Sequence, residues 1–138
     1  MDARDAARRW AETWRTAWEA LDLDPIVALY ASDATFSTEP FREPYRGPEG
    51  VRAYVERVFG EEEAPRVRTS EPIVDGDRAA ISWWASLQED GAEVTLAGTS
   101  VLRFDAERLV VEQWDAWNAA DGRRDPARAG TPFANSDV

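Results

Sequence analysis

The chain contains neither cysteine nor histidine in its 138 residues. The lack of cysteine excludes a disulfide framework and a thiolate nucleophile, and the lack of histidine removes the commonest zinc ligand and the usual acid/base group at neutral pH. The sequence also has no calcium-binding loop, no phosphate-binding loop and no dinucleotide-binding glycine pattern, so we expect no metal and no cofactor. Any catalysis is therefore expected to depend on carboxylates.

Positive charge is scarce as well. Basic residues number 16 against 27 acidic ones, which gives a formal net charge of -11. Such a surface repels phosphates and anionic lipids, so we expect no nucleic acid and no membrane among the partners. The first ten residues lack the apolar region of a secretory signal, and no run of about 20 apolar residues could span a bilayer. These features favour a cytoplasmic protein.

The length of the chain is typical of one domain. We expect residues 1–118 to form that domain, because apolar periodicity continues to about residue 117. From residue 119 onward the sequence consists mainly of Ala, Gly, Arg, Asp, Pro and Asn, with little apolar content. Residues 119–138 are therefore predicted to form a loosely ordered tail.

Seven tryptophans are an unusual number for a chain of this size, and three of them share one helical face. Trp10, Trp14, Trp18 and Leu21 follow the spacing i, i+4, i+8, i+11, which predicts an amphipathic helix with an aromatic stripe. The stripe is expected to cover a sheet. Whether its indoles only fill the core or also line a ligand site stays open at the level of sequence.

Two further helices are predicted before residue 62. One begins with Asp24 as N-cap and Pro25 at its first position, and the other follows Gly47 and ends at Gly60. A short strand lies between them and stops at Glu39, because the following proline has no amide hydrogen for a ladder. Alternation along this strand favours Glu39 pointing outward unless a bulge shifts the register.

After residue 65 the apolar period changes from helical to alternating, with turn signals between the segments. Short connections between strands favour an antiparallel meander, and the whole chain is predicted to be α+β with helices on one face of the sheet. Since both faces of the meander are apolar, we expect a homodimer through the outer sheet face. The predicted strands are Val67–Val74, Arg78–Gln88, Glu93–Phe104 and Leu109–Trp117.

The last predicted strand carries the most specific chemical signal. Its alternate residues Leu109, Val111, Gln113, Asp115 and Trp117 fall on one side, and that side is too apolar to face water. Desolvation there would raise the pKa of Asp115 toward the range of a general acid/base. The alternatives are a structural carboxylate that is satisfied by backbone amides or by an arginine, and a carboxylate at the exposed end of the sheet.

The order of the short motifs resembles a known family. The segment 22–47 runs from a short helix through a D-A-T strand to a carboxylate before proline and then an R-G turn, and Leu102–Phe104 is similar to that family's penultimate strand. From about Ala7 to Trp117 the chain looks like an NTF2-like, or SnoaL-like, domain. The resemblance implies a cystatin-like α+β cone, with three N-terminal helices packed on a curved, mainly antiparallel sheet.

The family contains several kinds of enzyme, and each implies different roles. For the ketosteroid isomerases the resemblance puts Glu39 at the general base, Trp14 at the tyrosine of the oxyanion hole and Ser100 at its protonated aspartate; neither Trp14 nor Ser100 restores that hole. For the polyketide cyclases it puts Asp115 at an acidic residue deep in the cavity.

A third branch, the limonene epoxide hydrolases, uses an Asp-Arg-Asp set. The corresponding candidates here, Arg103 and Asp105, lie near a predicted turn, so this alternative ranks lower than the other two. The resemblance thus implies an acid/base site inside the cone, with Asp115 as the first candidate and Glu39 as the second.

Our functional hypothesis is proton transfer on a small hydrophobic carbonyl compound with Asp115 as general acid/base, in an isomerase, cyclase or dehydratase type of reaction. The alternative is a protein that binds a ligand without transforming it, or a dimeric structural module. Tyr30 or Tyr54 is a candidate hydroxyl donor. The predicted pocket residues are Trp14, Trp18, Tyr30, Phe36, Tyr54, Trp83, Ser100, Gln113 and Trp117.

Overall fold

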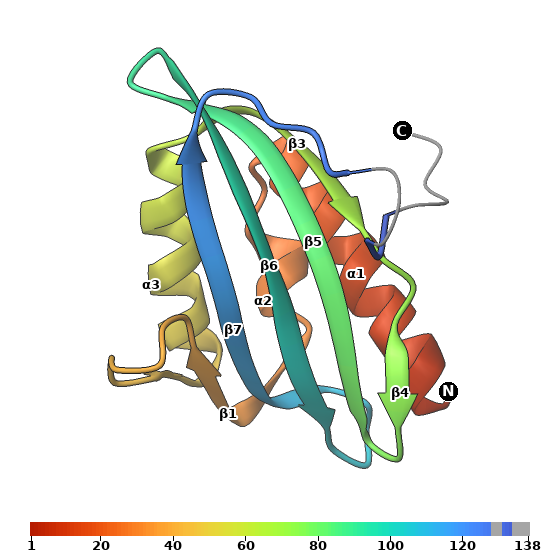
Figure 1. Ribbon diagram of the computed structural model, residues 1–138. Helices are drawn as coiled ribbons and strands as arrows, with labels where there is room; N and C mark the ends of the chain where they lie inside the picture. The colour runs from red at the N-terminus through yellow and green to blue at the C-terminus, as the bar shows by residue number, and fades with distance from the viewer. Residues whose placement is uncertain (128–130, 134–138) are drawn as a thin grey trace.

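A computed structural model describes residues 1–127 and 131–133 of the chain. Helices cover one face of a curved sheet, and the three helices come from the first half of the sequence (Figure 1). The elements in chain order are α1 (Ala3–Ala20), α2 (Asp24–Val27), β1 (Tyr30–Ser37), β2 (Tyr45–Arg46), α3 (Gly47–Gly60), β3 (Glu63–Thr69), β4 (Ile73–Asp75), β5 (Arg78–Glu89), β6 (Ala92–Phe104) and β7 (Val110–Asp121).

The long helix α1 confirms the prediction from the tryptophan stripe. Asp2 caps it by accepting a 2.8 Å hydrogen bond from the Asp5 amide, with a reciprocal capping box. Trp10 and Trp18 are buried on its inner face. Leu21, expected to continue the stripe, is instead the left-handed C-cap and is 37% exposed, because the helix has already ended.

The other two helices are short and medium in length. In α2, Asp24 is the first helical residue and Leu23 holds the N-cap position, so the prediction of Asp24 as cap is wrong by one residue. Its Ile26 is fully buried. Helix α3 ends at Gly60 as predicted, begins at Gly47, one residue earlier than predicted, and buries Val51 and Val55 against the sheet. Both helices carry proline in the first turn, where the missing amide hydrogen costs nothing.

The sheet is mixed, with strand order β2-β1-β7-β6-β5-β3 and β4 beside β5. The pairing of β1 with β7 is parallel, and all other pairs are antiparallel. The strand predicted over 67–74 is two strands, β3 and β4, because Pro72 interrupts it and cannot donate to a ladder. The last strand continues past Trp117 to Asp121, where its partner β6 supplies pairing as far as Val94.

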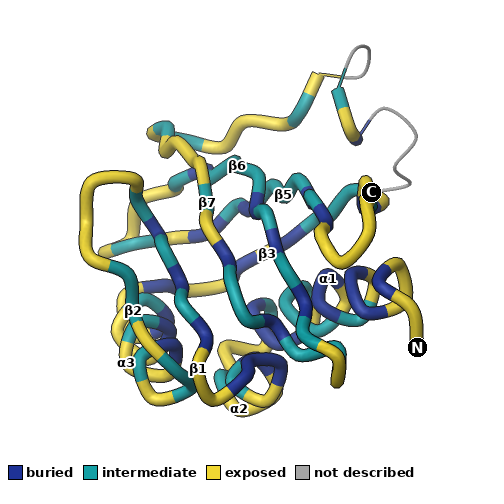
Figure 2. Tube along the Cα trace, turned by 90° about the horizontal axis from the view of Figure 1, so that it is seen from below, coloured by how far each residue is buried: buried dark blue, intermediate teal, exposed yellow. Residues whose placement is uncertain are grey.

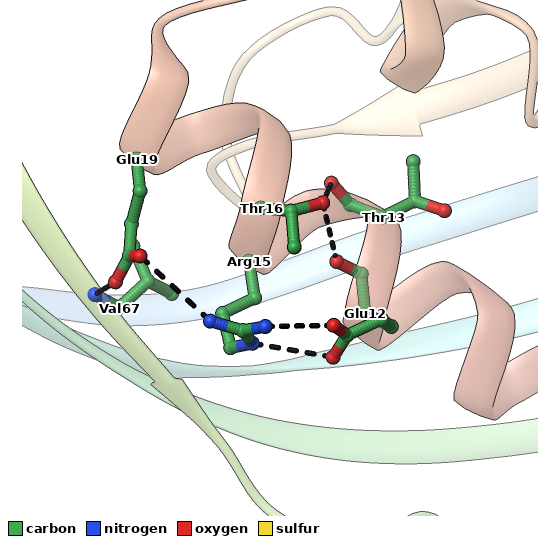
Figure 3. Close-up of polar contacts among 6 residues, drawn as sticks. All are labelled: Glu12, Thr13, Arg15, Thr16, Glu19 and Val67. Atoms are coloured by element: carbon green, nitrogen blue, oxygen red, sulfur yellow. Dashed lines mark hydrogen bonds and ion pairs between the residues drawn. The ribbon is translucent and has the colours of Figure 1, made fainter. Parts of the chain in front are cut away.

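Polar contacts on the outer side of α1 attach this helix to the edge of the sheet (Figure 3). Arg15 forms ion pairs with Glu12 and Glu19, at 2.7 and 3.7 Å. Glu19 also accepts a 2.8 Å hydrogen bond from the amide of Val67 in the edge strand β3. An edge amide that would otherwise lack a ladder partner is thereby satisfied. The bond fixes the end of α1 beside β3, where Trp18 enters the interior.

The segment after β7 passes over the face of the sheet that is opposite to the helices (Figure 2). The indole nitrogen of Trp84 donates a 2.7 Å hydrogen bond to the Arg124 carbonyl, and its ring meets Phe133 edge to face at 6.1 Å. Within the predicted tail, positions 119–121 belong to β7. Residues 128–130 and 134–138 lie outside the described residues.

The outer sheet face also carries Trp114, which is 39% exposed. The homodimer through this face stays a prediction. No helix in the described part of the chain has the length and apolar character needed to cross a membrane.

Candidate functional site

A cavity of about 350 Å³ lies between the helices and the inner face of the sheet. Its volume falls within the range of small-molecule sites, roughly 300–1,000 Å³. Most of its walls are aromatic or aliphatic. Of the residues predicted for the site, the following line it: Trp14, Trp18, Phe36, Glu39, Tyr54, Trp83, Ser100, Gln113, Asp115 and Trp117.

Asp115 lies on the inner face of β7, directly opposite Ser100 of β6. Its Oδ1 accepts two hydrogen bonds, from the Ser100 hydroxyl at 2.6 Å and from the Gln113 side-chain amide at 3.0 Å. No donor among the described residues reaches Oδ2. Burial raises the pKa of Asp115 to about 6, although the bonds from Ser100 and Gln113 act in the opposite direction.

A chain of hydrogen bonds behind Asp115 fixes its orientation. Tyr30 donates to Gln113 Oε1 at 2.5 Å, so the amide nitrogen of Gln113 is directed at Asp115. The Tyr30 hydroxyl in turn accepts from the indoles of Trp10 and Trp14 at 3.4 and 3.2 Å. Every donor in this chain points toward the carboxylate, and a satisfied buried network of this kind is rigid.

Tyr30 therefore does not line the pocket, and that prediction is wrong. The residue is 4% exposed, and its ring stacks on Phe36, which does line the cavity, with ring centroids 5.9 Å apart. Its hydroxyl is fully engaged by Trp10, Trp14 and Gln113. Tyr30 holds Gln113 in place and has no hydroxyl to offer a ligand.

The two positions that the isomerase resemblance assigns to the oxyanion hole are also occupied by internal bonds. Trp14 gives its only N–H to Tyr30, and Ser100 gives its hydroxyl hydrogen to Asp115. Ser100 meanwhile accepts from the indole of Trp83 at 3.0 Å. Neither Trp14 nor Ser100 is available to stabilise an oxyanion, so the hole of that enzyme type is not formed here.

Glu39 lies at the mouth of the cavity, two residues beyond the end of β1. Its side chain is 46% exposed and forms a loose 3.9 Å ion pair with Arg42, which also lines the mouth. The preceding Thr38 is buried, and its carbonyl accepts a 2.8 Å bond from the Trp117 indole. Solvent exposure leaves Glu39 in a poorer environment for acid/base work than Asp115.

Tyr54 lines the pocket and has an available hydroxyl. Its ring packs against Phe36 and Tyr45, with centroids 5.4 and 5.1 Å away, and no hydrogen-bond partner for the hydroxyl occurs among the described residues. Burial raises the pKa of Tyr54, and the negative charge of Asp115 raises it further. The hydroxyl thus stays protonated and can donate to a ligand within the field of Asp115.

A second carboxylate, Glu62, lines the same cavity and was not anticipated from sequence. It is 4% exposed, and its Oε1 accepts a 2.7 Å hydrogen bond from the Trp18 indole. Burial raises the pKa of Glu62 to about 7, and the nearby charges of Glu89 and Glu61 add to the shift against the Trp18 bond. The sequence showed only three consecutive glutamates after a helix, a pattern typical of solvent-exposed charge.

Gly98 of β6 gives the aromatic wall its shape. A Cβ there would lie 2.5 Å from the Ala116 carbonyl oxygen, 2.6 Å from Trp117 Cβ and 2.9 Å from the Trp83 ring. These distances exclude any side chain at the position without displacement of the neighbouring strand. Glycine therefore leaves room for the Trp83 ring and the Trp117 Cβ on either side of β6.

The candidates for an epoxide hydrolase set lie elsewhere. Arg103 pairs with Glu112 at 3.7 Å, and Asp105 accepts from the amides of Glu107 and Leu109 in the turn before β7. Neither Arg103 nor Asp105 lines the cavity. Across residues 1–127 and 131–133, no cluster of three or more acidic side chains is arranged to hold a metal ion.

Comparison with solved structures identifies the fold. An NTF2-like protein of unknown function from Exiguobacterium superposes with a TM-score of 0.69 at 17% identity, covering 82% of this chain and 98% of that one. SalBIII, an epoxide hydrolase/cyclase-like enzyme in pyran ring formation in polyether salinomycin, gives a TM-score of 0.73 at 16% identity, with coverage of 86% and 96%. The fold is therefore α+β and NTF2-like.

A third structure, a hypothetical protein with a ketosteroid isomerase-like fold from Catenulispora acidiphila in complex with trimethylamine, gives a TM-score of 0.64 at 20% identity, covering 76% of this chain and 82% of that one. The SnoaL-like domain model matches residues 8–113, and the chain belongs to that family. No curated protein matches the sequence.

Proposed function

We propose that this protein binds a small, flat, hydrophobic carbonyl compound and moves a proton on it, with Asp115 as the general base. The observation that carries the proposal is the state of the Asp115 carboxylate. One oxygen is held by Ser100 and Gln113, and the other has no donor among the described residues, in a cavity with aromatic walls. A fixed carboxylate with a raised pKa is suited to abstract a carbon-bound proton near neutral pH.

The walls favour a planar, largely apolar ligand. Trp14, Trp18, Trp83 and Trp117 present indole surfaces to the cavity, with Phe36 and Tyr54 beside them. Aromatic walls gain most from stacking and edge contacts with another ring system. A volume of about 350 Å³ accommodates a ligand of two or three fused rings, at the lower end of known sites.

The proposed step conserves protons and electrons. Asp115 Oδ2 takes a hydrogen from the carbon next to the carbonyl, and the electron pair of that C–H bond forms a C=C bond as the carbonyl becomes an enolate. The Tyr54 hydroxyl donates a hydrogen bond to the substrate, which lowers the cost of the developing negative charge. Return of the proton from Asp115 to carbon completes an isomerisation or an exchange.

Binding without turnover is the second candidate function. It is supported by the same aromatic cavity, since the tryptophans of α1 leave the interior open rather than filling it. The same scaffold carries enzymes and binders, so the fold does not separate the two functions. Proton exchange on a bound ketone does separate them.

The test is deuterium exchange of β-tetralone, a bicyclic ketone, in heavy water with and without protein. Wild-type protein is expected to accelerate incorporation at the carbon next to the carbonyl, as measured by NMR. Asp115→Asn keeps the shape but removes the base, and is expected to lower the rate about 100-fold or more. Quenching of tryptophan fluorescence measures binding separately, and binding by Asp115→Asn should persist.

Glu112→Gln is the matched control, because Glu112 lies on the same strand but pairs with Arg103 outside the cavity. It should exchange β-tetralone at the wild-type rate. Exchange by Asp115→Asn at the wild-type rate would remove Asp115 from the mechanism. Binding of β-tetralone without any accelerated exchange by the wild type would favour the binding function.

A further inference from the structure

Glu62 occupies a position that is unfavourable for a carboxylate. It follows the C-cap residue Glu61 at the end of α3, where the helix carboxyl terminus disfavours negative charge. It is 4% exposed, and no arginine pairs with it among the described residues. Other carboxylates, such as Glu12 and Glu19, have arginine partners at the surface. Burial of an acid without a charged partner lowers the stability of the fold, and no ion pair among the described residues offsets that cost for Glu62.

The local chain geometry directs this side chain inward. Ala64, two residues later, has a φ of 51°, and the pairing of β3 with β5 shifts register between Glu63 and Arg66. The irregular start of β3 leaves Glu63 exposed and turns Glu62 into the cavity. Its Oε1 is held by Trp18, and no protein donor or acceptor among the described residues reaches Oε2.

The two carboxylates, Glu62 and Asp115, lie on either side of an indole pair. Trp18 and Trp83 meet edge to face with centroids 5.8 Å apart. The N–H of Trp18 is directed at Glu62, while the N–H of Trp83 is directed at Ser100, which donates to Asp115. A ligand that contacts both rings would therefore have Glu62 on the Trp18 side and Asp115 on the Trp83 side.

Glu62 and Asp115 differ in the charged groups that surround them. Near Glu62 lie Glu61 from the α3–β3 turn and Glu89 from β5, and both raise its pKa. Asp115 has only neutral donors at its oxygen. The other charged or titratable groups along the cavity are Glu39 and Arg42 at the mouth and Tyr54 and Arg57 on α3.

We infer that Glu62 is a second catalytic residue, the general acid that works across the cavity from Asp115, on a conjugated ketone long enough to reach both. The inference rests on the proposed function and narrows its substrate class. The carbonyl oxygen would lie at the Glu62 end, and the carbon that loses its hydrogen would lie at the Asp115 end. In such a ketone a C=C bond lies between the carbonyl group and the carbon that loses its hydrogen.

The step balances without any added reactant. Asp115 takes the γ-hydrogen of the enone, and the C–H electron pair becomes a new C=C bond. The existing C=C electrons shift toward the carbonyl carbon, and the carbonyl π electrons take the proton of Glu62, which gives a dienol. In the reverse direction the dienol hydroxyl returns its proton to Glu62, and Asp115 protonates the carbon at the α or γ position.

A test that needs no substrate uses the indole N–H resonances in NMR. The Trp18 resonance should titrate with Glu62 at a midpoint near 7, and the Trp83 resonance should report Asp115 near 6. Glu62→Gln should abolish the Trp18 titration and leave that of Trp83. A Trp18 resonance that moves only near the ordinary glutamate pKa, 4.5, would contradict a proton held by Glu62 at neutral pH.

The catalytic test compares β-tetralone with octalone, a bicyclic enone whose γ-hydrogens lie far from its oxygen. Glu62→Gln is expected to slow γ-deuteration of octalone about tenfold or more. It should also remove the fall in rate above neutral pH, and it should slow exchange of octalone more than exchange of β-tetralone, whose reacting carbon lies next to its carbonyl. Glu63→Gln makes the same charge change on the exposed neighbour and should behave as wild type.

The outcomes separate the two claims. If wild-type protein exchanges neither ketone, the proposed function itself fails. If Asp115→Asn abolishes exchange of both ketones while Glu62→Gln exchanges octalone at the wild-type rate and with the wild-type pH profile, only the role of Glu62 is overturned.

Discussion

The two ends of the cavity each contain a carboxylate, and the two carboxylates are held in different ways. At one end Asp115 lies on a regular strand and is held by a chain of neutral donors from Ser100, Gln113 and Tyr30. At the other end Glu62 lies in an irregular turn, has one donor, Trp18, and has other glutamates nearby. Two hydrogen bonds reduce the cost of ionising Asp115, whereas Glu62 has only the bond from Trp18 among the described residues, and its acidic neighbours act against it.

We expect Asp115 and Glu62 to have different protonation states during catalysis. A carboxylate that accepts two hydrogen bonds is the stronger candidate to be ionised, and a carboxylate among like charges is the stronger candidate to hold a proton. With pKa values of about 6 and about 7, the state with Asp115 ionised and Glu62 protonated is favoured between the two values. A rate that depends on both groups is then bell-shaped in pH.

The largest effect on stability is expected at the Glu62 end. The folded-state pKa of Glu62 is raised from 4.5 to about 7, so the folded protein binds a proton more tightly than the unfolded chain does. Its contribution is therefore fully present below about pH 4.5 and is lost as pH rises through 7. Glu62→Gln should raise the free energy of unfolding at pH 8 by on the order of 3 kcal/mol.

Urea unfolding of wild type, Glu62→Gln and Glu63→Gln at pH 5 and pH 8 makes the measurement. The gain from Glu62→Gln should be large at pH 8 and small at pH 5, and Glu63→Gln should change little at either pH because its side chain is exposed. A loss of stability at pH 8 for Glu62→Gln would mean that the ionised form is stabilised by the fold, contrary to its environment in this structure.

The two ends of the cavity also differ in how far their residues could be predicted from the sequence. The period of the tryptophans predicted α1, and alternation along a strand placed Asp115 and Gln113 on the inner face, because regular elements repeat their geometry. Glu62 follows no period. Its burial depends on a positive φ at Ala64 and on a register shift in β3, and both arise from tertiary pairing.

Other differences have similar causes. Tyr30 was predicted to line the pocket as one of its aromatic residues. Its stacking on Phe36 and its absence from the cavity lining depend on three-dimensional packing. The last strand extends to Asp121 through alanine, asparagine and aspartate, residues with weak strand propensity, because β6 supplies the ladder. Tertiary context decides such positions.

A smaller loss of stability is expected from Gly98→Ala, which disturbs the wall between the two ends. The new Cβ would lie 2.5 Å from the Ala116 carbonyl oxygen, so β7 or the Trp117 ring must move. We expect a loss of about 1–3 kcal/mol, as for other overpacked cores, measured by urea unfolding. Gly60→Ala is the matched control, since a Cβ there meets nothing within 4 Å.

The same variant sharpens the comparison in NMR. If the two ends are held independently, Gly98→Ala should perturb the indole resonances of Trp83 and Trp117 more than that of Trp18, whose nitrogen is bonded to Glu62. Equal perturbation of all three would show that the indole pair couples the ends. Unchanged stability would contradict the close approach that glycine permits at this position.

The smallest effect is expected from Ser100→Ala, which makes the Asp115 end more like the Glu62 end. The variant removes the 2.6 Å hydrogen bond that lowers the pKa of Asp115, so that pKa should rise from about 6 toward that of Glu62. A net hydrogen-bond energy of about 1 kcal/mol corresponds to a shift of somewhat less than one unit. The rising limb of the exchange rate should move up in pH, and the maximum should fall because the two acids then titrate together. Movement of the falling limb instead would assign Asp115, rather than Glu62, to the proton-donating role.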